Sequence, residues 1–173
     1  MLPSNQLDTP HDPLKTGWYY IYDKPGFRGT AVFSAHVDYY PNIIGPFNKL
    51  KNSEIGDDIV VVMENGLEYK YRVIRKERYD VATIPMGDLI WPTNKPADTE
   101  WVTLITCGGE FRSATPGGPG EYLHRDVVVA ERSAILVSRA RTRGLPGAYR
   151  GSDAVRIGLP PIKGAQERQY HLP

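Results

Sequence analysis

Short apolar, β-branched runs alternate with polar positions along most of the chain, and segments rich in glycine and proline separate them. Alternation with a period of two is typical of a strand with one buried face. The pattern predicts strands at 18–22, 30–36, 59–63, 67–74, 101–107 and 126–130. Asn65-Gly66 between the third and fourth of these predicts a tight hairpin. Since no segment has the period of a good amphipathic helix, we predict an all-β barrel or sandwich.

The remaining segments are predicted to be irregular. Residues 38–47 indicate a loop with at most one helical turn, and 110–121 a flexible glycine- and proline-rich connection. Residues 75–100 contain three prolines and no clear period, and a loop of that length in a small domain is usually functional. Residues 138–152 are arginine-rich and predict a basic linker, after which 154–162 again has strand character.

Composition limits the classes of function that the chain can have. A chain of 173 residues is most simply one domain, and a net charge of +1 gives no basic surface for nucleic acid. The 17 glycines and 15 prolines suit many short strands joined by turns. No stretch has the length and apolarity of a membrane span, and the N-terminus lacks a signal peptide's pattern. We therefore expect a soluble chain without an anchor of its own.

The single cysteine, Cys107, follows the apolar run at 101–106 and precedes two glycines. One cysteine excludes a disulfide within the chain and a cysteine-rich zinc site. The commoner fate of a lone cysteine is a small buried hydrophobe, but a position at the predicted end of a strand favours a nucleophile that meets substrate. His36, after another apolar strand, is a candidate partner, and His124 competes with it.

Arg125 precedes the predicted strand 126–130. An arginine there is most often a surface charge, but it is also placed to donate hydrogen bonds to an oxyanion beside Cys107. Thr106 is either an ordinary β-branched strand residue or a group that positions a substrate carbonyl. Position and spacing alone leave a candidate Cys–His–Arg site, with each member open to a purely structural interpretation.

The combination resembles the sortase family. Residues 103–107 (TLITC) match that family's strand ending in Thr-Leu-x-Thr-Cys, and 34–38 (SAHVD) resemble its strand-end histidine motif, where a glycine usually stands in place of Ala35. Arg125 precedes a valine-rich strand, as the family's arginine does. Supporting matches follow in the same order over roughly residues 7–131. The single-domain style looks most like class E or F sortases of high-GC Gram-positive bacteria or Chloroflexi.

The resemblance implies a closed β-barrel of about eight strands with short helical turns, and a cysteine protease-like transpeptidase that works through a thioacyl-enzyme. Cys107 would attack a sorting signal of the Leu-Pro-x-Thr-Gly or Leu-Ala-x-Thr-Gly kind after its threonine. Arg125 would stabilise the oxyanion and His36 would protonate the leaving amine. Arg112 is the alternative arginine, because the loop before Arg125 leaves the register around 122–126 open.

On the same basis we expect substrate contacts from the residues around the strand ends and from one wall formed by 75–100. The expected contacts are Thr106, Ala35, Ile105, Ile90 and Trp91, with Val81, Ile84, Met86 and Leu89 as further apolar candidates for the signal's leucine. For each apolar residue of 75–100, capping the barrel is the commoner role.

The resemblance implies defined partners and a place of action. The partners are a sorting-signal peptide of surface proteins and an amine acceptor, on a peptidoglycan precursor or a pilin lysine. We expect a monomer without metal or cofactor, acting in surface protein anchoring at the outer face of the membrane or in the cell wall of a Gram-positive-type bacterium. The alternative is an inactive sortase-like β-barrel that only binds peptide. A peptidoglycan cross-linking cysteine transpeptidase ranks lower, because its Ser-His-Gly-Cys neighbourhood is absent.

The strand that opens a sortase barrel is missing at the start of the chain, and 155–162 (VRIGLPPI) resemble it. We therefore expect one sortase domain over 1–173 in which 154–173 supply the first strand by circular permutation and 138–152 form the bridge. The alternative is an unrelated tail on a barrel that lacks its first strand.

Overall fold

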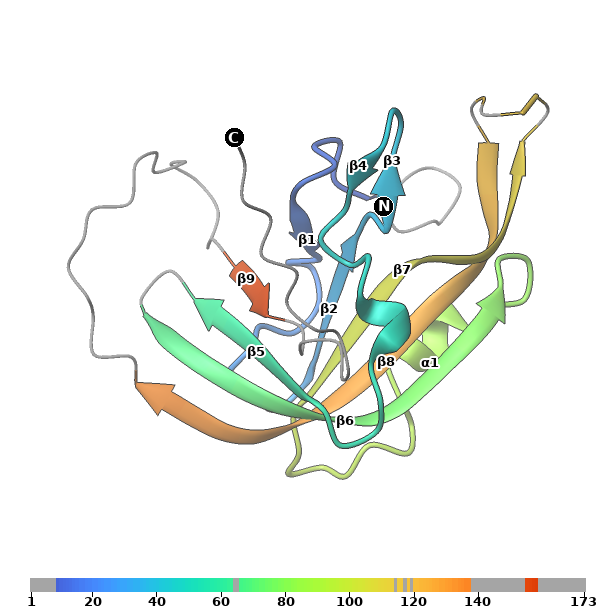
Figure 1. Cartoon of the computed structure of the whole chain (residues 1–173). Helices are drawn as coiled ribbons and strands as arrows, with labels where there is room; N and C mark the ends of the chain where they lie inside the picture. Colours follow the sequence, from blue (N-terminus) through green and yellow to red (C-terminus); the bar gives the residue numbers. More distant parts are fainter. Residues whose placement is uncertain are drawn as a thin grey trace, which may run out of the picture.

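A computed structural model describes residues 9–63, 66–113, 115–116, 118, 120–137 and 155–158. One sheet of seven strands dominates these residues (Figure 1). Its strands, in spatial order, are β1 (Thr16–Trp18), β2 (Thr30–Ala35), β7 (Trp101–Ser113), β8 (Gly120–Val137), β6 (Leu67–Asp80), β5 (Asp58–Met63) and β9 (Val155–Gly158). A small hairpin of β3 (Asp38–Tyr39) and β4 (Ile43–Ile44), the 3₁₀-helix η1 (Leu50–Asn52) and the α-helix α1 (Met86–Ile90) complete the described elements.

The sheet is curled, and its two edge strands approach each other. Neighbouring strands pair antiparallel, except for β2 and β7, which are parallel. β9 pairs with β5 at one edge, and β1 at the other edge lies close to β9 (Figure 1). This arrangement confirms the predicted all-β class and is consistent with the predicted barrel.

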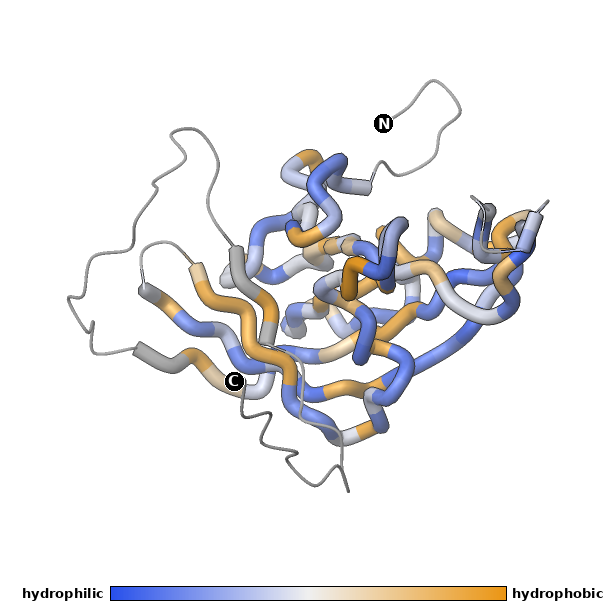
Figure 2. Tube along the Cα trace, turned by 45° about the horizontal axis from the view of Figure 1, so that its top comes forward, coloured by the Kyte–Doolittle hydropathy of each residue, from blue (hydrophilic) through white to orange (hydrophobic). Residues whose placement is uncertain are grey.

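Two groups of buried side chains cover the two faces of the sheet. The first fills the inside of the curl, with Phe33, Leu104 and Val128 at its centre. The second lies on the opposite face and joins Ile105 to Leu89 of α1. β2 and the first half of β7 are therefore buried on both faces, which explains their nearly continuous apolar sequences. β5 alternates in burial although residues 59–63 are all apolar, and Figure 2 shows it as one continuous hydrophobic stretch.

The strands around the candidate nucleophile are longer than the sequence predicts. β7 does not end at Cys107 but continues to Ser113, paired with β8 from Gly120 across an irregularity between Gly108 and Phe111. The prediction that the two glycines end the strand is therefore wrong, as is the expectation of a wholly irregular connection at 110–121. Gly108 is paired with His124, and Gly109, with φ +73°, lies in the irregularity after which pairing resumes at Phe111.

The segment 75–100 is also more ordered than predicted. β6 continues through Asp80, paired with the first half of β8, and α1 follows within the same segment. The extension of β6 is mostly exposed on both faces, so its sequence lacks the apolar alternation that identifies a strand. Residues 38–47 similarly form the β3–β4 hairpin where a loop was expected.

The predicted C-terminal strand lies at the edge of the sheet. β9 pairs antiparallel with β5, with Val61 opposite Ile157, and Ile157 packs against the inner core. Circular permutation stays a prediction, because 138–154 and 159–173 lie outside the described residues.

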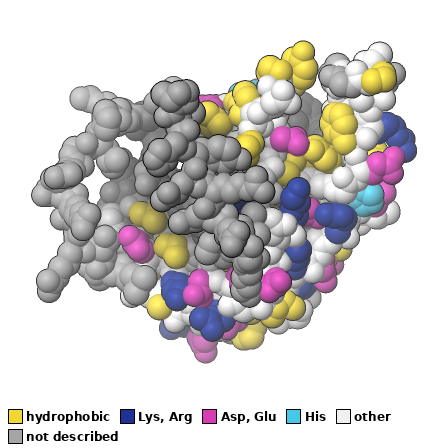
Figure 3. Space-filling view, in the orientation of Figure 1, with side chains coloured by type: hydrophobic (Ala, Val, Ile, Leu, Met, Phe, Trp, Pro, Cys, Tyr) yellow, Lys and Arg dark blue, Asp and Glu magenta, His cyan; other side chains and the backbone are white. Residues whose placement is uncertain are grey.

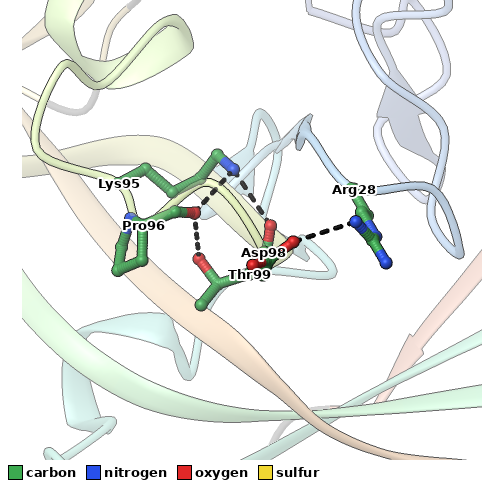
Figure 4. Close-up of polar contacts among 5 residues, drawn as sticks. All are labelled: Arg28, Lys95, Pro96, Asp98 and Thr99. Carbon is green, nitrogen blue, oxygen red and sulfur yellow. Dashed lines mark hydrogen bonds and ion pairs between the residues drawn. The ribbon is translucent and has the colours of Figure 1, made fainter.

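Polar contacts at the surface and one buried acid hold the connection from α1 to β7. Lys95 Nζ donates to the carbonyl of Thr99, and Arg28 pairs with Asp98 at 2.9 Å (Figure 4). Glu100, next in the chain, is 2% exposed. Its Oε1 accepts hydrogen bonds from the Gly26 amide at 2.7 Å and from the Tyr71 hydroxyl at 2.5 Å.

Replacement of Glu100 by alanine is expected to destabilise the fold by about 3–5 kcal/mol. The change leaves the buried Tyr71 hydroxyl without its acceptor and removes the partner of Arg132, which pairs with Glu100 at 3.1 Å. Urea denaturation of both proteins measures the difference in free energy of unfolding.

Asp98→Ala is the matched control, because it removes a neighbouring acid whose ion pair with Arg28 is exposed. Its expected cost is about 0.5 kcal/mol or less. Equal losses in the two variants would contradict a special role of the buried carboxylate.

Candidate active site

The register of β7 and β8 places Cys107 directly opposite Arg125. Side chains of residues opposite each other in an antiparallel pair lie on the same face, with Cβ atoms about 4.5–5.5 Å apart. Both residues line one cavity of about 290 Å³. The thiol and the guanidinium that the sequence singled out are therefore neighbours facing one space.

A side-chain hydrogen bond joins the strand of Cys107 to the strand that leads to His36. The Thr106 hydroxyl donates to the Ala35 carbonyl oxygen at 2.7 Å, and both residues are buried. β2 and β7 run parallel, with Ser34 opposite Ile105. The backbones just before His36 and just before Cys107 are thus fixed to each other, and both residues stand at the same end of the sheet.

The His36 ring is turned toward the N-terminal segment. Its Nε2 lies 2.9 Å from the Pro10 carbonyl oxygen, and because a carbonyl only accepts, this nitrogen carries the proton. Tyr39 packs edge-on against the ring, with centroids 5.2 Å apart. His36 is not among the residues that line the cavity with Cys107, whereas Thr9, beside Pro10, is.

The cavity has an end made of strand residues and an apolar wall. Three of the predicted substrate contacts, Ala35, Ile105 and Thr106, lie at the strand end, together with Ser34 and Tyr19. The wall consists of Val81, Ile84 and Met86, from the connection between β6 and α1 and the start of α1.

The other two predicted substrate contacts lie elsewhere. Ile90 is 4% exposed and belongs to the outer core, whereas Trp91 is 62% exposed and packs edge-on against Tyr22. Neither residue lines the cavity.

The remaining sequence candidates are separated from Cys107. Arg112 pairs with Glu121 farther along the β7–β8 hairpin and is exposed. His124 stands next to Arg125 in β8, so its side chain faces the opposite side of the strand. A Cβ at Gly109, where φ is +73°, would lie 2.4 Å from the His124 ring, so the second glycine makes room for that ring.

Burial and nearby charges act in opposite directions on Cys107. Burial is the largest effect and raises the pKa of the thiol, Arg125 lowers it, and Asp38 raises it. The guanidinium of Arg125 is held by the chain, because Nη1 donates to the carbonyls of His124 at 3.0 Å and Tyr122 at 3.3 Å. Arg125 is therefore a fixed cation that favours the thiolate in a site whose burial opposes it.

Alkylation of Cys107 by iodoacetamide is expected to have a pH midpoint above the ordinary cysteine pKa of about 8.5, because only the thiolate reacts and its pKa is raised. The same thiol in the urea-unfolded chain is the control and should titrate near the ordinary value. A midpoint in the folded protein below that of the unfolded chain would contradict this description of the site.

Sequence reasoning missed one pair of residues at the site. The Tyr122 hydroxyl donates to Asp38 Oδ2 at 2.6 Å, and these residues lie 84 positions apart. The one available signal was that Asp38 follows His36 by two positions.

Neither a metal site nor a membrane-spanning helix is found in the described ranges. They contain no group of three or more His, Cys, Asp or Glu side chains that could hold a metal ion. A search of the same residues for a helix of sufficient length and apolarity to span a membrane also finds none.

Comparison with known proteins gives a family and a fold. A model of the sortase domain matches residues 3–133. SrtA sortase from Actinomyces oris has a TM-score of 0.52 at 19% sequence identity, covering 78% of this chain and 72% of that one. A lid mutant of sortase A from Corynebacterium diphtheriae gives 0.50 at 21%, covering 69% and 55%, and sortase C1 from Streptococcus agalactiae gives 0.50 at 22%, covering 70% and 54%.

This chain thus spans little more than half the length of the latter two proteins. No curated protein matches it.

Proposed function

Because this chain belongs to the sortase family, we propose that it is a cysteine transpeptidase that cleaves a sorting signal of the Leu-Pro-x-Thr-Gly or Leu-Ala-x-Thr-Gly kind after threonine. The observation that carries the proposal is the pairing of Cys107 with Arg125 at one cavity. A nucleophile beside a fixed cation suits acyl transfer, because charge develops on the carbonyl oxygen as the sulfur attacks.

In the proposed first step the Cys107 thiolate attacks the threonine carbonyl carbon, and the oxygen becomes an anion that Arg125 stabilises. When the tetrahedral intermediate collapses, the bond to the glycine nitrogen breaks. His36, as an imidazolium that holds the proton lost by the Cys107 thiol, gives that nitrogen a proton and becomes neutral. In the structure the proton on His36 Nε2 is donated to the Pro10 carbonyl. For this step the leaving amine must therefore replace the Pro10 carbonyl as the hydrogen-bond partner of His36 Nε2.

In the second step an amine attacks the thioester and gives a proton to the now neutral His36, the carbon–sulfur bond breaks and Cys107 leaves as a thiolate. The proposed acceptors are an amine on a peptidoglycan precursor or a pilin lysine, with water as the hydrolytic substitute. The proposed setting is the outer face of the membrane or the cell wall of a Gram-positive-type bacterium. We propose that the enzyme belongs to class E or F and acts as a monomer.

The apolar wall of the cavity is the proposed site for the leucine of the signal. Val81, Ile84 and Met86 offer an aliphatic surface beside Cys107. A volume of about 290 Å³ lies near the lower end of the range for ligand pockets, about 300–1,000 Å³. That size suits a short apolar segment of peptide rather than a large ligand.

One observation favours the alternative of a barrel that binds peptide without cleaving it. In the structure the proton of His36 Nε2 is engaged by Pro10, and Thr9 lines the cavity. A protein in which this arrangement persists would bind a peptide at the apolar wall but would lack the acid for the leaving amine.

A panel of quenched fluorescent peptides distinguishes the two functions. It contains Leu-Pro-x-Thr-Gly and Leu-Ala-x-Thr-Gly sequences, scrambled versions of each, and a glycine amide or lysine derivative as acceptor. We expect cleavage between threonine and glycine and a product joined to the acceptor. Saturable binding of the same peptides with no cleavage would overturn the enzyme and support the binder.

A further inference from the structure

The hydrogen bond between Asp38 and Tyr122 connects the two sides of the candidate active site. Asp38 begins β3, two residues after His36, and Tyr122 lies in β8, three residues before Arg125. The Tyr122 hydroxyl donates to Asp38 Oδ2 at 2.6 Å, a short contact typical of a charged acceptor. One side-chain contact thus joins the segment of His36 to the strand of Arg125.

Tyr122 also contacts its surroundings in two other ways. Its carbonyl oxygen accepts a hydrogen bond from Arg125 Nη1, and its ring packs edge-on against Phe111 with centroids 5.0 Å apart. The backbone of Tyr122 therefore holds the guanidinium, while its hydroxyl holds Asp38. Figure 3 shows hydrophobic side chains gathered at the tip of the β3–β4 hairpin, where Tyr40 and Ile44 are exposed, so packing at that tip does little to fix the hairpin.

Asp38 and Tyr122 also interact electrostatically with Cys107. Asp38 raises the pKa of Cys107, and burial, followed by Asp38 and then Cys107, raises the pKa of Tyr122 to about 12. Tyr122 is therefore a neutral donor at neutral pH. The negative charge of Asp38 disfavours the Cys107 thiolate that catalysis needs. We therefore expect Asp38 to have another role at the site.

We propose that Asp38 and Tyr122 form a clasp, the Asp38–Tyr122 clasp, that positions His36 and Arg125 on opposite sides of Cys107. Neither residue reacts with substrate; both are positioning residues. The inference rests on the proposed function, since it concerns the geometry of that reaction. The clasp fixes the start of β3 relative to β8, and the Tyr122 hydroxyl offsets part of the charge that Asp38 presents to the thiolate.

The groups that face Cys107 determine whether a substitution raises or lowers the pKa of its thiol. Arg125 and Tyr122 come from β8, Asp38 from β3, and Tyr19 lines the cavity from the segment after β1. His36 stands at the same strand end. Of these groups, Asp38 is the anion. Loss of its charge is therefore expected to lower the pKa of Cys107, whereas loss of the Tyr122 hydroxyl leaves that charge in place.

The test compares Asp38→Asn and Tyr122→Phe with two controls. Asp98→Asn removes an exposed acid that precedes β7, about 20 Å along that strand from Cys107, which is well beyond the Debye length of about 8 Å at physiological salt. Tyr20→Phe removes the hydroxyl of a tyrosine that is 80% exposed. Each variant is measured for kcat on the reporter peptide and for the pH midpoint of Cys107 alkylation.

Both clasp variants are expected to lose roughly 10- to 100-fold in kcat, because misplacement of reacting groups by about 1 Å has effects of that size. The double variant should lose little more than either single one, since both remove one contact. The alkylation midpoint should fall in Asp38→Asn and should not fall in Tyr122→Phe. The controls should match the original protein in both measurements.

Full kcat in either clasp variant, or an unchanged alkylation midpoint in Asp38→Asn, would overturn the clasp. If the original protein cleaves no peptide, the proposed function has failed. The alkylation midpoints still test whether Asp38 acts on Cys107 in that case, because they need no turnover.

Discussion

Replacement of Cys107 by alanine is expected to abolish peptide cleavage and leave the fold intact. Cys107 is the sole cysteine of the chain, so no other thiol can form the thioester. Loss of the nucleophile removes the covalent route altogether, and losses of several orders of magnitude in kcat are the rule for such changes. Initial rates on the reporter peptide measure the effect.

The stability of the same variant separates chemistry from folding. Cys107 is only partly buried, at the edge of a cavity, and alanine removes one sulfur atom. The free energy of unfolding should change by about 1 kcal/mol or less. Cys107→Ser serves as a matched variant, because it keeps a polar atom at the same place yet lacks the thiolate. Most of the activity surviving in Cys107→Ala would end the account of this chain as a cysteine enzyme.

Replacement of Arg125 by lysine is expected to lower kcat by about 100-fold or more, although the positive charge is kept. The guanidinium is fixed by two backbone carbonyls that both contact Nη1, and it has further donors in a planar set beside the cavity that Arg125 lines. A lysine ammonium is a point charge on a flexible stem and does not reproduce that geometry. Steady-state kinetics on the reporter peptide should show the loss in kcat rather than in KM alone.

Arg112→Lys is the control for this change. Arg112 is an exposed residue of the same hairpin and lies opposite Glu121, away from the cavity. It should retain nearly full activity. If Arg112→Lys is crippled and Arg125→Lys is not, the assignment of the arginine is wrong.

The sequence predicts the central strands because burial leaves a pattern. β2, β5 and the first half of β7 pack against a core, and their apolar residues identify them. The ends of β6 and β7 are mostly exposed and lack that pattern, so the predicted strands end too early. Cross-strand pairing stabilises these ends, and a single sequence does not show it.

The same distinction applies to the site. The segment of Cys107 could be identified from its motif, and Arg125 from its place before a strand. That Cys107 and Arg125 are neighbours depends on the register of β7 and β8. The glycine- and proline-rich loop between these strands leaves that register open in the sequence. The Asp38–Tyr122 contact joins residues 84 positions apart, and the sequence signalled only Asp38, by its place two positions after His36. Ile90 looked like a substrate contact by composition, but α1 turns it into the outer core.

The state of His36 is the feature that most limits the proposed reaction. The fold brings Thr9 to the cavity and the Pro10 carbonyl to the imidazole, so the acid must exchange one acceptor for another during turnover. Gly17 allows this contact, because a Cβ there would stand 2.9 Å from the Pro10 ring. Thr9 and Pro10 are thus part of the site and belong in any mechanistic experiment.

Mass spectrometry of the intact protein after brief mixing with a Leu-Pro-x-Thr-Gly peptide, without an acceptor amine, tests the central claim most directly. We expect a mass increase equal to the peptide's acyl portion up to threonine. That adduct should map to Cys107, disappear on addition of hydroxylamine and be absent from Cys107→Ala. Release of the glycine fragment with no adduct on Cys107, or an adduct that persists in Cys107→Ala, would contradict it.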